Sequence, residues 1–322
     1  MMSEPAITLL KQLAAEGVSP WLAGSDTQFL PGTLYRPAET ALLHGAVASN
    51  ADPETVRRAC DTLWETYLRS EGRHGRVSVP VDPRIAHDAE AILADARSIQ
   101  TEVGRPNVLV RIAATPAGLA AMENCLALGI AVDTDLVFSA ERYEEVLTSY
   151  LAGMERALAA GRALGPLVAV ASVPVGLLDA EVNDRLADRP GRPALAARAR
   201  DTAGVALART IYRIREERLG GNWWRVLRAA GAVPPGLLWT AVTPRHISGL
   251  VGSNTGQVAT LEALESAAAL SDLRGDTLLN AHEDAHRDLD LLESLGVRMA
   301  DVAAFLEAAE LGRLRESWIL RP

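Results

Sequence analysis

Arg111, Asp133 and Asp135 are charged residues inside two runs of the sequence that are otherwise apolar, 107–115 and 130–139. Residues two apart point to the same side of a strand, so the two aspartates share a face. A cation beside two carboxylates can hold an anionic or polarised group and transfer protons. We therefore assign Arg111 to anchoring or polarising a substrate, Asp135 to general acid or base chemistry, and Asp133 to orienting Arg111.

The same three residues also fit a purely structural interpretation. A buried charge is costly unless it is paired, and one carboxylate is enough to pair Arg111. In that case Asp133 and Asp135 would complete an ion-pair network that only fills the interior. The additional carboxylate favours chemistry, but the sequence leaves both interpretations open.

Further polar residues follow the predicted strands. Asn50 and Ser172 end two strands and could hydrogen-bond a hydroxylated substrate, or could only cap the strand ends. Arg245 and His246 follow another strand and could bind phosphate or shuttle a proton, or could form a surface loop pair. We predict all four as substrate-binding residues.

His282 and His286 formally match the H-E-x-x-H zinc motif. They lie on a late predicted helix whose apolar stripe, with Ala285 and Leu289, faces the core, so the histidines flank that stripe near the surface. We expect no metal there, and no other cofactor in the chain.

These residues lie on alternating strands and helices. The charged runs form a strand–helix–strand unit around the helix 116–129, and such a unit makes its strands parallel. Strands are expected at 20–23, 46–49, 77–81, 107–115, 130–139, 167–172, 237–243 and 257–260. Helices are expected at 7–15, 52–69, 83–102, 116–129, 140–161, 179–219 with a break near 190–193, 261–270, 281–295 and 300–311.

Eight such alternations predict a closed (β/α)8 barrel with extra helices at both ends, built as a single domain over residues 1–322. An open doubly wound sheet is the alternative, but residues 24–26 after the first strand lack its glycine-rich phosphate turn. Active sites of such barrels lie at the C-terminal ends of the strands.

The composition narrows the class of protein. The 322 residues are 48% hydrophobic and 23% charged, with a net charge of −9, and no basic cluster suits a nucleic-acid partner. The sequence shows neither a bilayer-length apolar run nor a secretion signal, so we expect a cytoplasmic protein without a membrane partner. Cys60 and Cys125 are expected to be buried free thiols. A small-molecule substrate is the expected partner, and a homodimer is left open.

Lys11 is the only lysine among the 32 Lys and Arg residues. A Schiff base requires an amine whose pKa can be lowered, and arginine cannot supply one. Lysine chemistry is therefore nearly excluded.

Several stretches resemble signatures of the transaldolase family, in the family's order. They are Val81–Arg84, Arg105–Val108, Ala114–Thr115, Gly129–Ile130 and Phe138–Ser139, with a similar stretch at Leu292–Ile319. The resemblance implies a (β/α)8 barrel that handles phosphorylated ketoses through a lysine Schiff base.

The sequence also departs from the family pattern. Asn50 and Ser172 are retained, but the resemblance implies that the catalytic residues of the family are replaced. Arg111 stands where the family has its Schiff-base lysine, Ala23 where it has its acid/base aspartate, and Pro80 where it has the glutamate of the third strand. Asp133 and Asp135 stand where it has the asparagine and threonine of the fifth strand, and Leu177 where it has a phosphate-holding arginine. Ordinary transaldolase activity is therefore not expected.

Two hypotheses follow. The first is a repurposed enzyme of specialised biosynthesis that performs aldol-type, isomerase or lyase chemistry without a Schiff base, on a small polar, sugar-derived, phosphorylated or carboxylated metabolite. The second is an inactive homologue that serves as a binding or assembly protein. An open pocket of several hundred Å³ above Arg111 would favour the enzyme, and a filled barrel interior would favour the binding protein.

Overall fold

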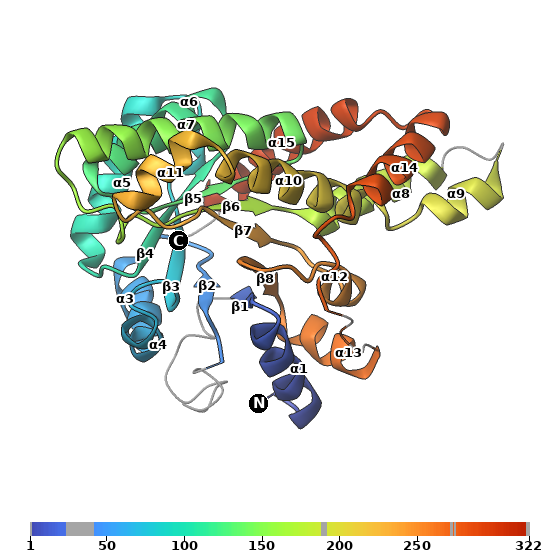
Figure 1. Cartoon of the computed structure of the whole chain (residues 1–322), viewed down its shortest axis with the longest axis horizontal. Helices are drawn as coiled ribbons and strands as arrows, with labels where there is room; N and C mark the ends of the chain where they lie inside the picture. The colour runs from blue at the N-terminus through green and yellow to red at the C-terminus, as the bar shows by residue number, and fades with distance from the viewer. Residues whose placement is uncertain (1, 24–41, 188–191, 271–272, 274, 320–322) are drawn as a thin grey trace.

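The computed structural model describes residues 2–23, 42–187, 192–270, 273 and 275–319. Eight parallel strands close into a barrel in which each strand pairs with its neighbours in the sequence and β8 pairs with β1 (Figure 1). The strands are β1 Val18–Ala23, β2 Gly45–Val47, β3 Arg76–Pro80, β4 Val108–Ala113, β5 Val132–Asp135, β6 Ala169–Val173, β7 Gly236–Trp239 and β8 Thr255–Ala259. The predicted (β/α)8 barrel is confirmed.

Helices surround these strands, and additional helices precede the first strand and follow the last one (Figure 1). They are α1 Glu4–Ala15, α3 Pro53–Thr62, α4 Trp64–Arg69, the 3₁₀ turn η2 Pro83–Ile85, α5 Ala89–Val103, α6 Pro116–Leu128, α7 Ala140–Ala159, α8 Val175–Ala187, α9 Pro193–Ala199, α10 Ala203–Leu219, α11 Asn222–Ala229, α12 Pro244–Gly249, α13 Leu261–Leu270, α14 His282–Ser294 and α15 Met299–Ile319.

Local sequence signals fix several helix ends. Asp52 caps α3 by accepting the N–H of Thr55, and Pro53 occupies the first turn, as the sequence predicts. Thr115 caps α6 in the same way by accepting the N–H of Gly118. Gly129 ends α6 with φ +92°, a left-handed conformation that glycine adopts without a side-chain clash. These ends connect β4 to β5 through one short helix.

The expected helices differ from the structure at several boundaries. The segment 83–102 begins as the turn η2, and α5 starts only at Ala89 because Asp88 caps it by accepting two backbone N–H groups. The segment 52–69 is two helices, which meet at Leu63. Helix α8 begins four residues before the expected Asp179. Residues 190 and 191 of the expected break near 190–193 lie outside the described residues, and α9 begins at Pro193. Helices α11 and α12 were not expected, and α15 extends to Ile319.

The inside of the barrel has an apolar centre. A separate cluster of buried residues lies there, with members on six strands or directly before them: Trp21, Leu109, Ala131, Val168, Val170, Leu238 and Val258. The polar side chains Ser78, Asp133 and Ser172 hydrogen-bond one another across β3, β5 and β6, so all three point inward. The apolar layer between strands and helices forms the larger core. Polar groups therefore stand in the interior beside the apolar cluster.

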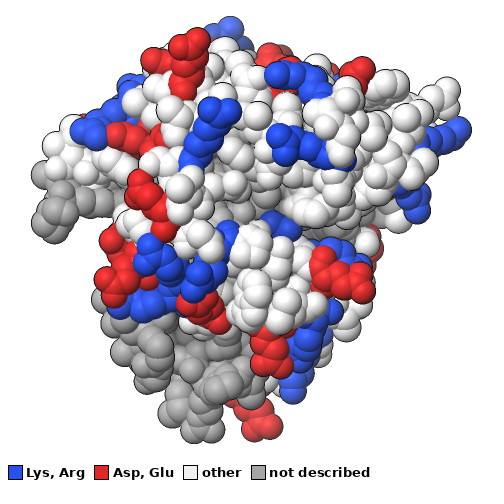
Figure 2. All heavy atoms as spheres, turned by 90° about the vertical axis from the view of Figure 1, so that its left-hand side faces the viewer, with Lys and Arg blue, Asp and Glu red and all other residues white. Residues whose placement is uncertain are grey.

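The remaining compositional expectations concern thiols, membranes and charge. Cys60 and Cys125 are free and buried, and burial raises the pKa of each thiol to about 12. Among the described residues, no helix combines the length and apolar character that crossing a membrane requires. Figure 2 shows acidic and basic side chains interspersed over one face of the molecule, without a continuous basic field.

Candidate active site

A cavity of about 400 Å³ lies at the C-terminal ends of the strands, where active sites of such barrels are found. Strand ends and the segments that follow them form its wall, and α15 forms the rest. The lining residues are Ala23, Val47, Ala48, Ser49, Arg111, Asp135, Leu136, Ser172, Pro174, Leu177, Thr240, Ala241, Val258, Glu310, Arg313, Leu314 and Ser317. We call this space the upper cavity. Three of the predicted site residues, Arg111, Asp135 and Ser172, line it together.

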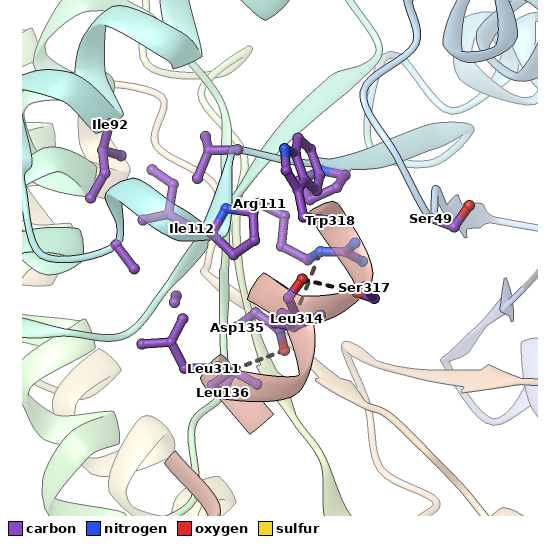
Figure 3. A pocket seen from close by; sticks show the side chains of 15 residues that line it. Ser49, Ile92, Arg111, Ile112, Asp135, Leu136, Leu311, Leu314, Ser317 and Trp318 are labelled. Atoms are coloured by element: carbon purple, nitrogen blue, oxygen red, sulfur yellow. Dashed lines mark hydrogen bonds and ion pairs between the residues drawn. The ribbon is translucent and has the colours of Figure 1, made fainter. Parts of the chain in front are cut away.

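Arg111 and Asp135 face each other at the wall of the upper cavity, and Figure 3 shows them from the adjacent small recess, which they also line. The Nε atom of Arg111 lies 3.7 Å from Oδ2 of Asp135, and both side chains are largely buried. Nη2 of Arg111 donates to the carbonyl oxygen of Ala48 at 2.8 Å. Oδ1 of Asp135 accepts the N–H of Leu136 at 2.8 Å. At 3.7 Å the two side chains form an ion pair that is longer than a hydrogen bond.

Asp133 lies deeper than the wall of the upper cavity and is fully buried. Its two oxygens accept the hydroxyls of Ser78 at 2.5 Å and Ser172 at 2.7 Å. Burial and the nearby Asp135 carboxylate raise the pKa of Asp133 to about 6, against the opposing effects of Arg111 and the two serines. Asp133 therefore reaches the cavity through Ser172.

The expected pairing of Asp133 with Arg111 is not the one in the structure. The carboxylate within ion-pair distance of Arg111 belongs to Asp135. Burial raises the pKa of Asp135 as well, while Arg111 and the N–H of Leu136 lower it. The two aspartates thus differ in surroundings: one touches the cation and the cavity, and the other touches two hydroxyls.

Helix α15 closes over the cavity and supplies two charged residues that the sequence interpretation missed. Glu310 and Arg313 line the upper cavity and form an ion pair of 2.6 Å between carboxylate and guanidinium. Glu310 raises the pKa of Asp135 and Arg313 lowers it. An apolar recess of about 40 Å³ also lies under this helix, beside Arg111, and Leu314 and Trp318 help to line it (Figure 3). In the sequence, the only indication of this pair is the i, i+3 spacing of the two charged residues on the last helix.

Two residues that line the upper cavity have left-handed backbones. Leu136 has φ 61° and Ala241 has φ 53°, a conformation that costs energy for residues with a Cβ atom. A Cβ atom at Gly176 would lie 1.8 Å from the carbonyl oxygen of Ala241, so only glycine fits beside that turn. Such strain concentrates at functional sites.

The remaining predicted residues lie outside the upper cavity. Asn50 follows the lining residue Ser49, and its Oδ1 accepts the N–H of Asp52 at the start of α3. The side chain of Arg245 is 81% exposed and pairs with Asp201. Geometry therefore assigns these two residues to a helix start and a surface ion pair.

His246 is buried and both of its ring nitrogens have partners. Nε2 lies 2.8 Å from Oδ2 of Asp179, and Nδ1 accepts the N–H of Thr243. Oδ1 of Asp179 accepts the N–H of Gly204. The pair therefore links α8, α10 and α12. His246 does not line the upper cavity, so the structure does not place it beside a substrate there.

No metal centre emerges from the part of the chain that the structure describes. No group of three or more His, Cys, Asp or Glu side chains there could hold a metal ion. His282 and His286 lie on α14 with their rings edge to face, 6.3 Å between centroids. Neither residue lines the upper cavity.

Comparisons with known proteins identify the family. A sequence model of the family described as transaldolase/fructose-6-phosphate aldolase matches residues 45–319. The chain belongs to this family. Transaldolases of Acidothermus cellulolyticus and Parafrankia sp. are each 38% identical to it over 271 residues, which cover 82% of this chain and 72% and 73% of theirs. A transaldolase of Mycolicibacterium paratuberculosis is 38% identical over 274 residues, covering 82% of this chain and 73% of its own. The family resemblance seen in the sequence is confirmed.

Proposed function

We propose that this transaldolase-family chain is an enzyme that performs acid/base chemistry without a Schiff base. The supporting observation is the upper cavity of about 400 Å³, which Arg111 and Asp135 line together. That volume falls in the usual range for small-molecule sites, roughly 300–1,000 Å³. An inactive binding protein with a filled interior, the alternative hypothesis, would leave no such space.

The absence of lysine from the cavity supports the non-covalent route. The family resemblance places the Schiff-base lysine at Arg111, whose guanidinium cannot form an imine because it stays protonated. Lys11 is exposed on α1 and is not among the residues that line the upper cavity. Arg111 would instead hold a carbonyl or developing oxyanion with its N–H groups.

Asp135 is the residue that we expect to transfer protons. Its carboxylate lines the cavity next to Arg111, and burial raises its pKa toward the working range of a general acid or base. Proton removal beside a carbonyl held by Arg111 would serve aldol-type cleavage, isomerisation or dehydration. Asp133 would keep the hydroxyl of Ser172 oriented, with its oxygen available to a substrate hydroxyl.

Two arginines, Arg111 and Arg313, give the upper cavity two places for an anionic substrate group, although the lining also holds two carboxylates and has no net charge. Leu177, where the resemblance places the family's phosphate-holding arginine, lines the upper cavity, and so does Arg313 of α15. We infer that Arg313 takes over the anionic end of a phosphorylated or carboxylated, sugar-derived metabolite. The name of the family, transaldolase/fructose-6-phosphate aldolase, agrees with such a class.

A thermal-shift screen with sugar phosphates and sugar acids tests the site. A true ligand should raise the Tm of the wild type by about 3–5 °C at about 100 times its Kd. Arg111→Ala should lose that shift, while Arg69→Ala, an exposed arginine on α4, should keep it. Equal Tm shifts in Arg111→Ala and Arg69→Ala, or no Tm shift of the wild type with any compound, would count against the proposed enzymatic function. With a substrate in hand, Arg111→Ala and Asp135→Asn should each abolish turnover.

Reductive trapping tests the non-covalent route directly. The chain is incubated with fructose 6-phosphate and sodium borohydride, and its intact mass is compared with that of an unfolded sample treated in the same way. We expect no extra adduct on the folded chain. A folded-state adduct on Lys11 would overturn the proposed chemistry.

A further inference from the structure

The structure contains a second cavity at the opposite end of the barrel. It has a volume of about 440 Å³ and lies where the strands begin, because Gly17, Gly236 and Thr255, at or just before the starts of β1, β7 and β8, line it. We call it the lower cavity. It shares no lining residue with the upper cavity.

The inner wall of the lower cavity is apolar. Trp21, Val168, Val170 and Leu238, all members of the apolar cluster inside the barrel, line it. Glycine next to Trp21 lets the ring approach the strands: a Cβ atom at Gly45 would lie 2.5 Å from ring carbons. The ring therefore lies close against β2 and is almost completely buried, so it forms part of the apolar wall of the cavity.

The rim of the lower cavity carries one cation. Arg73 and His74 line it, and the described residues that line it include no carboxylate. Burial, together with Arg73 and Arg76, lowers the pKa of His74, so its imidazole is neutral at neutral pH. An anion would therefore find the Arg73 guanidinium without a competing carboxylate in the lining.

Arg76 is a buried cation without a carboxylate partner among the described residues. It is 1% exposed; Nε donates to the carbonyl oxygen of Gly72, Nη2 donates to that of Pro166, and Nη1 has no partner in the described part of the chain. The ring of Tyr67 lies 5.5 Å from its guanidinium carbon. A buried charge of this kind is costly unless an anion compensates it. The two carbonyls and the ring only partly do so, and Arg76 itself is not among the residues that line the lower cavity, so it acts on an anion there only at a distance.

We propose that the lower cavity binds a small organic anion with an apolar body. The body packs against the apolar inner wall, and the anionic group faces Arg73. Aromatic or short branched carboxylates have this chemistry. The site is separate from the upper cavity and does not depend on the proposed enzymatic function.

Isothermal titration with 2-naphthoate tests this site, with the uncharged 2-naphthalenemethanol as the matched ligand. The wild type should bind naphthoate about tenfold more tightly than the alcohol, which corresponds to one charge-assisted contact. Arg73→Glu should remove this preference. Arg69→Glu, which changes the exposed arginine on α4 by the same charge, should retain it.

The Arg111→Ala variant separates the two cavities. It should bind naphthoate as the wild type does, because Arg111 does not line the lower cavity. Loss of binding in Arg111→Ala with retention in Arg73→Glu would place the probe in the upper cavity and overturn the proposal. Equal affinity for acid and alcohol, or no saturable binding up to about 5 mM naphthoate, would also overturn it.

Discussion

Replacing Asp133 by asparagine should stabilise the folded chain at neutral and alkaline pH. The carboxylate is fully buried, and its partners are the neutral hydroxyls of Ser78 and Ser172. Asparagine is nearly the same size and can hydrogen-bond both serines, because it both donates and accepts. The variant removes the buried negative charge and keeps the packing.

The magnitude follows from the pKa of Asp133. An aspartate of an unfolded chain titrates near 3.9, whereas burial raises the pKa of Asp133 to about 6. Between these two pKa values the carboxyl group is ionised in the unfolded chain but still protonated in the folded chain, so the free energy of unfolding falls as the pH rises. Above about pH 6 the free energy of unfolding is lower by the full amount, about 3 kcal/mol, and below about pH 4 it is not lowered. We expect Asp133→Asn to gain about 1–3 kcal/mol at pH 8 and close to nothing at pH 4.

Urea denaturation of both chains at pH 4, 6 and 8 measures this difference. Asp284→Asn, which changes an exposed aspartate on α14, is the control and should alter stability by less than about 0.5 kcal/mol. The reasoning would be refuted if Asp133→Asn were less stable than the wild type at pH 8, as expected for a buried ion pair that had lost a partner. A gain of equal size at all three pH values would refute it too.

Three further outcomes follow from the same structure. Arg313→Ala should weaken the binding of an anionic upper-cavity ligand about fivefold to twentyfold by titration calorimetry and leave Tm nearly unchanged, because its side chain is largely exposed. Cys60 and Cys125 should resist iodoacetamide at pH 8 and react fully in urea, as followed by intact mass, because burial raises the pKa of both thiols to about 12. His246→Ala should lower the free energy of unfolding by about 2–4 kcal/mol in urea melts, since it leaves the buried Asp179 carboxylate without its imidazole partner.

The sequence predicts the barrel well because its strands are short apolar runs separated by capped helices. All eight strands lie where those runs occur, with ends that differ by a few residues. Helices α11 and α12 were missed because they have only eight and six residues. A helix this short leaves little periodicity to detect.

The site was predicted in part. Alternation along β5 correctly places Asp133 and Asp135 on the inward face, but it cannot tell which of them pairs with Arg111. In register Arg111 lies beside Asp133, yet its long side chain reaches Asp135 at the strand end. The roles of Glu310 and Arg313 depend on how α15 docks on the barrel, and local sequence patterns do not contain that information.

The docking of α15 also has a consequence for the order in which the molecule is made. This helix follows all eight strands in the chain, yet it supplies Glu310, Arg313 and Leu314 to the upper cavity. A nascent chain that has completed its strands therefore still lacks part of the binding wall. A ligand that touches both the strands and α15 would hold the helix in place, and occupancy of the cavity would protect the chain from proteolysis at this helix.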